Sequence, residues 1–285
     1  MIGVFVLLYS MSKMSESGEP LIVLTNDDGI HSPGLLAAAE ALAPLGWVLV
    51  AAPSEQQSGS GRSMTGTADI VTERLEKVID GNYWEVYAVR GTPAQAVQQA
   101  LLVLSDCNPD LVVSGINYGE NVGSGITISG TVGAALEGAS FGIPALAVSQ
   151  EMNVHYQLSH SEEVDFSAAK HFTRLFARRL LSLPVIDDVD VLKVEVPSDA
   201  TGQTPWRVTR QSRQKYYVPL MPDDRHLESD GQMPYRRDID FAALELDSDI
   251  SVLVKERSVS VTPISLDLTS RVGLDSYEKK LRDFC

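Results

Sequence analysis

Cysteine is scarce in this chain of 285 residues, which contains two, Cys107 and Cys285. Two cysteines so far apart cannot form a framework of disulfide bonds, and they are too few for a zinc site built from thiolates. A small secreted domain stapled by disulfides is therefore excluded. The composition favours a protein of the reducing cytoplasm.

Positive charge is also scarce. The chain has 23 lysine and arginine residues against 38 aspartate and glutamate residues, so its formal net charge is −15 at pH 7. A surface of this sign repels nucleic acid phosphates and anionic membranes, so neither is expected as a partner. If the ligand is itself an anion, a local cation or a set of backbone N–H groups must supply the attraction.

The segment that most suggests a membrane or a signal peptide is the apolar run Ile2 to Tyr9. It has eight residues, whereas a membrane-spanning helix needs about 20. No basic stretch precedes it, and no A-x-A type cleavage site follows it. Because Met11 and Met14 come soon afterwards, residues 1–19 are interpreted as a disordered lead-in or a misassigned start.

Short apolar strands alternate with helices over the first two thirds of the chain. A strand, a helix and a strand within about thirty residues form a βαβ unit, and repetition of this pattern produces a parallel sheet with helices on both faces. The sequence therefore predicts an α/β fold with a Rossmann-like three-layer core at 20–190. Strands are predicted at 21–25, 47–51, 69–74, 83–89, 111–114 and 145–149, and helices at 33–45, 92–104, 130–141 and 162–181.

The pattern becomes less regular after Pro184. Strands are predicted at 191–196 and 206–209, a polar stretch with prolines at 219–234, and a last helix at 274–283. We expect a C-terminal extension at 191–285 that consists of β-hairpins projecting from the core and this helix. Such an extension commonly serves contacts between subunits, and a simple lid is the structural alternative.

Two adjacent carboxylates, Asp27 and Asp28, follow the first strand in the sequence NDDG. They repel each other unless a cation lies near, and hard divalent cations prefer such oxygen ligands. The alternative is an ordinary Asx turn with a negative charge at a helix start. The loops at 53–63 and 114–131 follow other strands of the same sheet, so the three loops are expected to converge where α/β proteins bind ligands.

The loop at 114–131 is unusually rich in glycine, with six glycines among the nineteen residues from Gly115 to Gly133. Ser129, Gly130 and Thr131 open the next helix, where free N–H groups and the helix dipole favour phosphate. Neither a Walker motif nor a dinucleotide fingerprint occurs. The segment therefore predicts a phosphate site of another kind, and a long structural loop is the alternative.

Five segments resemble, in this order, the motifs of the SurE family, the stationary-phase survival proteins that act as metal-dependent 5′(3′)-nucleotidases. These segments are LTNDDGIHSPGL, APSEQQSGSGRS, VRGTPAQAV, SGINYGENVG and SGTVGAALEGASFGIPALAVS. The resemblance runs from Leu21 to Ser149 and resumes weakly in WRVTRQSRQKYY and SDISVLVKERSVSVTPISLDLT. It implies a homodimer or homotetramer with exchanged C-terminal segments.

The resemblance also implies a set of site residues. The implied ligands of a divalent ion are Asp27, Asp28, Ser58 and Asn117, and the implied phosphate contacts are Asn121, Ser129, Gly130 and Thr131. Carboxylate, hydroxyl and amide oxygens are all hard donors, so Mg²⁺ or Mn²⁺ is the expected cofactor. Two departures stand out: Arg62 is found where the family often has histidine, and Glu256-Arg257-Ser258 where it often has a Gly-Tyr pair.

The sequence thus predicts a cytoplasmic, metal-dependent phosphomonoesterase that converts nucleoside 5′-monophosphates to nucleoside and phosphate. The family resemblance implies that 3′-monophosphates are further candidate substrates. Metal-activated water is the expected nucleophile, with Asp27 or Asp28 as the group that helps to deprotonate it. Two alternatives stay open. One is a phosphatase that forms an aspartyl-phosphate on Asp27, although such enzymes usually place their two carboxylates two residues apart. The other is a nucleotide-binding sensor without turnover, which could dispense with the aspartate pair.

Overall fold

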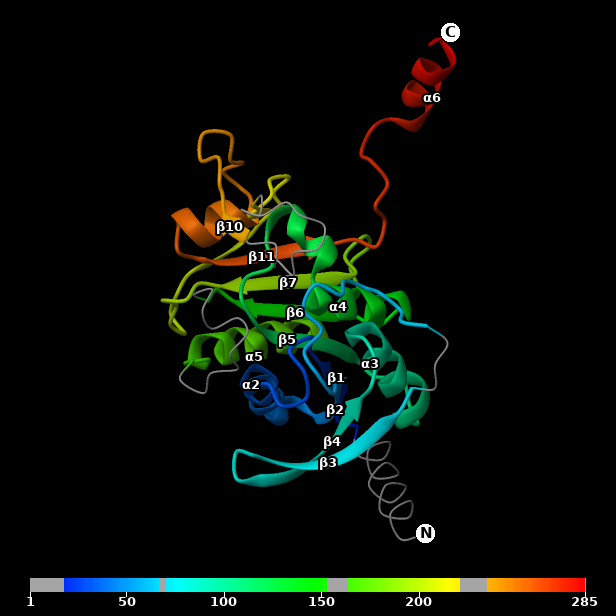
Figure 1. The fold of residues 1–285 in the computed structure, drawn as a ribbon, viewed down its shortest axis with the longest axis vertical. Helices are drawn as coiled ribbons and strands as arrows, with labels where there is room; N and C mark the ends of the chain where they lie inside the picture. The colour runs from blue at the N-terminus through cyan, green and yellow to red at the C-terminus, as the bar shows by residue number, and fades with distance from the viewer. Residues whose placement is uncertain (1–17, 67–69, 153–163, 221–234, 285) are drawn as a thin grey trace, which may run out of the picture.

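A computed structural model of the chain describes residues 18–66, 70–152, 164–220 and 235–284. Its centre is a nine-stranded sheet with the order β3-β4-β2-β1-β5-β6-β7-β11-β8, and Figure 1 shows these strands stacked from β3 near the bottom of the view to β11 near the top. The strands are β1 (Leu21–Thr25), β2 (Trp47–Pro53), β3 (Thr72–Ile79), β4 (Asn82–Val89), β5 (Leu111–Tyr118), β6 (Ala145–Gln150), β7 (Val191–Val196), β8 (Trp206–Val208) and β11 (Val259–Ile264).

The middle of the sheet is parallel and is covered by helices on both faces. Strands β4, β2, β1, β5, β6 and β7 share one direction. Strand β3 runs antiparallel to β4, and β11 runs antiparallel to β7 and parallel to β8. Helices α2 (Pro33–Leu42) and α5 (Ser167–Ser182) pack on one face, and α3 (Pro93–Gln99) and α4 (Gly130–Ser140) on the other. The predicted Rossmann-like three-layer α/β fold is therefore confirmed.

Local sequence explains where these helices begin. Pro33 and Pro93 occupy the first helical positions of α2 and α3, where the missing N–H of proline costs nothing. Thr92 and Gln95 form a reciprocal capping box at the start of α3. Ser129 caps α4, because its hydroxyl accepts a hydrogen bond from the N–H of Val132. A short helical segment, η2 (Ala100–Leu104), directly continues α3, and another, η3 (Gly123–Ile128), precedes α4.

Several strands differ from the prediction. Strand β3 spans 72–79 rather than 69–74, and β11 lies where no strand was predicted. Strand β5 continues through Tyr118 into the segment expected to be a glycine-rich loop, and a register shift against β6 lies between Ser114 and Asn117. Strand β7 does not project in a hairpin but pairs with β6 in the sheet. Its alternation of apolar and charged residues is typical of an exposed edge strand, yet Lys193 and Glu195 are buried here.

The C-terminal extension contains elements outside the main sheet. Strands β9 (Tyr217–Pro219) and β10 (Tyr235–Arg237) form a separate antiparallel pair. Helix α6 (Leu274–Arg282) lies at the end of an extended segment that leads away from the body in Figure 1, and all of its residues are exposed. The proposed boundary between 190 and 191 stays a prediction, and the sheet crosses it. The interpretation of residues 1–19 concerns mainly 1–17, which lie outside the described residues.

Within the part of the chain that the structure describes, no helix combines the length and the apolar character needed to cross a bilayer.

Candidate active site

The predicted site lies where the strand order reverses. Strands β1 and β5 are neighbours, and the chain builds the sheet outward from them in opposite directions, toward β2 and toward β6. Ligands in open α/β sheets bind at such a switch point, beyond the carboxyl ends of the strands. Asp27 and Asp28 follow β1, Asn117 is the second-last residue of β5, and Ser58 is in the loop after β2.

The turn after β1 is made by Asn26 rather than by the two aspartates. The side-chain oxygen of Asn26 accepts from the N–H of Gly29 at 3.1 Å, and its amide donates to the carbonyl of Gly29 at 3.0 Å. Gly29 has a φ of 96°, a conformation that glycine adopts without strain. The turn therefore does not require Asp27 and Asp28, which are buried with 4% and 1% of their surface exposed.

Asp28 connects the three predicted loops. Its Oδ2 accepts from the backbone N–H of Tyr118 at 3.1 Å, and its Oδ1 accepts from Nε2 of Gln56 at 3.2 Å. The same Nε2 donates to Oγ of Ser58 at 3.0 Å. Asn117, next to Tyr118, donates from Nδ2 to the carbonyl of Gly119 at 2.7 Å, which fixes the orientation of its amide. The structure thus brings the segments that carry Asp28, Ser58 and Asn117 together.

Asp27 lies at the start of α4. The hydroxyl of Thr131 donates to its Oδ1, and the backbone N–H groups of Gly130 and Thr131 also stabilise its carboxylate. The positive end of a helix dipole favours an anion at this position. In this structure the anion is Asp27 itself, and the Ser129 hydroxyl caps the helix. Phosphate contacts from Ser129, Gly130 and Thr131 stay a prediction.

The electrostatics of the aspartate pair favour a bound cation. Burial raises the pKa of Asp27, and the hydrogen bond from Thr131 partly offsets this effect. Burial, and then the charge of Asp27, raise the pKa of Asp28 well above its ordinary value. A nearby cation stabilises both carboxylates in their charged form. Within the described ranges, no group of three or more His, Cys, Asp or Glu forms a metal-binding cluster. A metal site here would therefore combine the two carboxylates with hydroxyl and amide oxygens. Such a donor set suits Mg²⁺ or Mn²⁺.

Asn121 lies beside this group of residues. Its Nδ2 donates to Oγ of Ser149 at 3.0 Å, and Ser149 is the register partner of Asn117 across β5 and β6. The Asn121 side chain is partly exposed, whereas Ser149 is fully buried. The structure therefore places the predicted phosphate contact next to the predicted metal ligand Asn117.

Sequence reasoning missed three residues of this region: Gln56, Ser60 and Ser149. Gln56 links Asp28 to Ser58, and only the folded loops reveal this contact. Ser60 has a buried hydroxyl without a hydrogen-bond partner. A Cβ placed on Gly130 would lie 2.8 Å from both that hydroxyl and Oδ2 of Asp27, so Ser60 lies close to Asp27. Its position two residues after Ser58, in the same serine-rich loop, is a signal that could have identified it.

Arg62 and Arg257, which lie at the two positions that differ from the family motifs, form ion pairs. Arg62 donates to Glu137 of α4 at 2.6 Å, which ties the loop after β2 to that helix. Arg257 donates to Glu151 at 2.7 Å and to Asp199 at 2.6 Å. Its φ of 49° lies in the left-handed region, which favours glycine. The hydrogen-bond and ion-pair partners found for these two side chains are not the proposed metal ligands.

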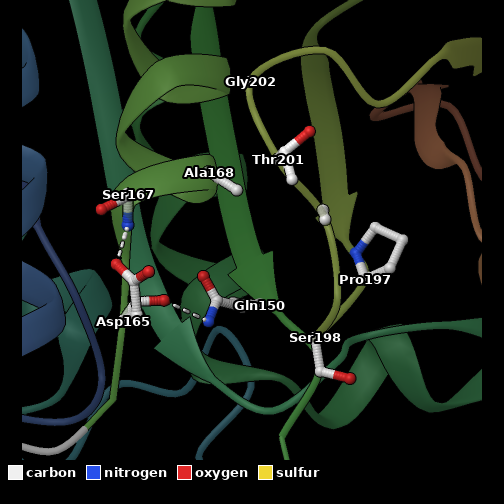
Figure 2. Close-up of a pocket in the computed structure, with 9 residues that line it drawn as sticks. Gln150, Asp165, Ser167, Ala168, Pro197, Ser198, Thr201 and Gly202 are labelled. Carbon is white, nitrogen blue, oxygen red and sulfur yellow. Dashed lines mark hydrogen bonds between the residues drawn. The ribbon is translucent and has the colours of Figure 1, made fainter.

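A cavity of about 230 Å³ lies at the same edge of the sheet, beyond β6 and β7 and next to the start of α5. Figure 2 shows Gln150, Asp165 and Ser167 on one side of it and Pro197, Ser198 and Thr201 on the other. Nε2 of Gln150 donates to the carbonyl of Asp165 at 3.0 Å, while its Oε1 is buried without a partner. None of the proposed metal ligands lines this cavity.

The mostly parallel sheet and the buried carboxylate pair at its switch point identify the class of this protein. It is an α/β protein with a candidate site for a cation and an anionic ligand. The family model described as "Survival protein SurE" matches residues 22–218. The chain belongs to the SurE family.

Relatives and a solved structure agree with this assignment. A protein of Thermococcus gammatolerans named 5′-nucleotidase SurE is 41% identical over 264 residues, which cover 91% of this chain and 95% of the relative. The protein of the same name from Thermococcus kodakarensis is 40% identical, with 91% and 98% covered. The crystal structure of the SurE protein from Aquifex aeolicus matches with a TM-score of 0.70 and 31% identity, and the match covers 92% of this chain and 100% of that one.

Proposed function

We propose that the protein is a metal-dependent phosphomonoesterase that hydrolyses nucleoside 5′- or 3′-monophosphates to nucleoside and inorganic phosphate. The shared name of its relatives, 5′-nucleotidase SurE, supports this class of enzyme. The observation that carries the proposal is the buried pair Asp27 and Asp28 at the switch point, linked through Gln56 to Ser58.

In this proposal Asp27, Asp28, Ser58 and Asn117 are the ligands of one Mg²⁺ or Mn²⁺ ion. When bound, such an ion polarises a phosphoryl oxygen and makes a water molecule acidic enough to be the nucleophile. Hydrogen bonds prepare the protein groups for this role: Tyr118 and Gln56 orient Asp28, and Gly119 orients the amide of Asn117.

The remaining steps use groups of the chain. Asp27 or Asp28 accepts the proton of the attacking water. The amide of Asn121, held by Ser149, donates to a phosphoryl oxygen. The start of α4, at Ser129, Gly130 and Thr131, supplies the positive end of a helix dipole, which stabilises charge on the phosphate as it now stabilises Asp27.

The proposal includes assembly into a homodimer or homotetramer through the C-terminal segment. Leu274, Tyr277 and Leu281 support it, because these apolar side chains of α6 are exposed in the single chain. We also place the protein in the cytoplasm, and the exposed free thiol of Cys107 supports this compartment.

Phosphate release from a panel of nucleoside 5′- and 3′-monophosphates tests the reaction. We expect release with Mg²⁺ or Mn²⁺ and none with a chelator. A single turnover in ¹⁸O water should place the label in phosphate, and acid quenching should trap no phosphorylated protein. A stable phospho-aspartate on Asp27 would support the covalent mechanism instead. Binding of nucleotide without release under any divalent cation would support a sensor.

A further inference from the structure

Strand β7 carries two oppositely charged side chains into the interior of the protein. Lys193 and Glu195 are both fully buried. They lie two residues apart and therefore on the same face of the strand, opposite Ala147 and Ser149 of β6. Buried charges are costly unless they have charged or hydrogen-bonding partners. Their partners therefore indicate why they are present.

Both side chains bind the backbone of Asn121. Nζ of Lys193 donates to the carbonyl of Asn121 at 2.8 Å, and Oε2 of Glu195 accepts from the N–H of Asn121 at 2.9 Å. Glu195 thus fixes the peptide group before Asn121, and Lys193 fixes the peptide group after it. The register partner of Glu195, Ser149, accepts from the side chain of the same asparagine.

Asp249 completes the cluster. It is fully buried, and its Oδ2 accepts from Lys193 at 3.0 Å. It also accepts from the backbone N–H groups of Gly123, Ser212 and Ile250. Lys193 therefore keeps an ion pair that does not involve Glu195. Because of this second partner, Glu195 can be replaced without leaving the lysine charge unpaired.

We infer that Lys193 and Glu195 are positioning residues, which hold Asn121 in the orientation that binds the phosphoryl group of the substrate. This inference rests on the proposed role of Asn121 in phosphate binding. Asn121 lies between the end of β5 and the turn η3, where no regular element fixes its backbone. Hydrogen bonds from buried side chains to both of its peptide groups reduce its freedom before the ligand arrives, so less order has to be gained on binding.

Replacement of Glu195 provides a matched pair of variants. Glu195→Leu removes the acceptor for the Asn121 N–H, whereas Glu195→Gln keeps an acceptor oxygen at nearly the same volume. Calorimetry with inorganic phosphate in the presence of Mn²⁺ measures binding without depending on turnover. We expect Glu195→Leu to raise the Kd of phosphate on the order of tenfold. The Kd of Mn²⁺ should stay unchanged, and Glu195→Gln should behave like the wild type. If Glu195→Leu does not fold, Glu195→Asp serves the same test, since it shortens the side chain by one methylene.

Asn121→Ala separates this inference from the proposed function. In that variant phosphate binding should already be weak, and Glu195→Leu should weaken it no further. If Asn121→Ala weakens phosphate binding but Glu195→Leu does not, or if the two effects simply add, the positioning role is wrong and the role of Asn121 stands. If Asn121→Ala binds phosphate like the wild type, the assignment of Asn121 is wrong and the inference falls with it.

Discussion

At the scale of single residues, Gly130 has no space for a side chain. A Cβ at this position would lie 2.6 Å from the Cβ of Asp27 and 2.8 Å from the hydroxyl of Ser60. Gly130→Ala should therefore displace Asp27, lower the free energy of unfolding by about 1–3 kcal/mol and weaken Mn²⁺ binding. Urea denaturation and calorimetry measure the two effects.

Gly125→Ala is the matched control for this change, because a Cβ on Gly125 would have no atom within 4 Å. It should leave both the unfolding free energy and the Mn²⁺ affinity close to those of the wild type. If Gly130→Ala were equally harmless, Asp27 would not need its present position against α4 to bind the metal.

Glu195 should make stability depend on pH. Burial raises its pKa from 4.5 to about 8, against the opposing effects of Lys193 and the Asn121 N–H, while the charges of Asp249 and Glu120 raise it further. The folded protein then binds more protons than the unfolded chain between pH 4.5 and about 8. The stability that this group contributes is complete below pH 4.5 and is lost as the pH rises to about 8.

The variant Glu195→Gln does not titrate and supplies the reference. The unfolding free energy of the wild type should fall relative to that of Glu195→Gln as the pH is raised over this range, in urea titrations at several pH values. A difference that stayed constant or grew with pH would show that Glu195 is charged throughout.

Only part of the site could be predicted from the residues alone. Asp27 and Asp28 stood out because two adjacent carboxylates after a buried strand are unusual. The role of Gln56 could not be predicted, because it depends on how the loop after β2 folds against Asp28. Lys193 and Glu195 did leave a signal, since two opposite charges on one face of an apolar strand require partners, but the sequence does not say which partners these are.

At the scale of secondary structure elements, β7 and β11 determine how assembly can be tested. A chain ending near Asp187 would lack both strands and should unfold, because they extend the central sheet beyond β6. A chain ending at Thr269 keeps the sheet and removes α6. Light scattering should show a smaller species for this chain than for the full-length protein, with little change in melting temperature.

The double substitution Leu274→Ser and Leu281→Ser should also produce the smaller species, since it removes two exposed apolar side chains of α6. Lys280→Ser, on the same helix, should leave the assembly intact. If the full-length protein and the chain ending at Thr269 scattered light as species of the same size, the contribution of α6 to assembly would be refuted.

The strands of the parallel core were predictable because they are short apolar runs followed by turn or capping residues, as Leu21–Thr25 is. Strand β5 was predicted too short, because Gly115 and Gly119 indicate a loop although the backbone between them still pairs with β6. Strand β7 was placed outside the sheet, because its charges break the apolar pattern by which buried parallel strands are identified.

At the scale of the whole molecule, a chain with a net charge of −15 is proposed to bind an anion. Further acidic residues, Glu120, Glu195 and Asp249, lie near the loop that carries Asn121. Lys193 offsets part of this charge within the interior. Attraction for a phosphate group must therefore be local, and the proposed metal ion between Asp27, Asp28, Ser58 and Asn117 is its main source.

The rate of phosphate release from a nucleoside 5′-monophosphate with Mn²⁺ tests this account most directly when wild type, Asp28→Asn and Asp110→Asn are compared. Asp110 makes the matched control, because it accepts from the N–H of Leu21 at the opposite end of β1. Asp28→Asn keeps the shape of the side chain but removes a charge, and it should lower the rate on the order of a hundredfold while the fold survives. Asp110→Asn should stay within about twofold of the wild type. An Asp28→Asn protein that released phosphate at nearly the wild-type rate would contradict the account, because the metal site would then have to lie elsewhere.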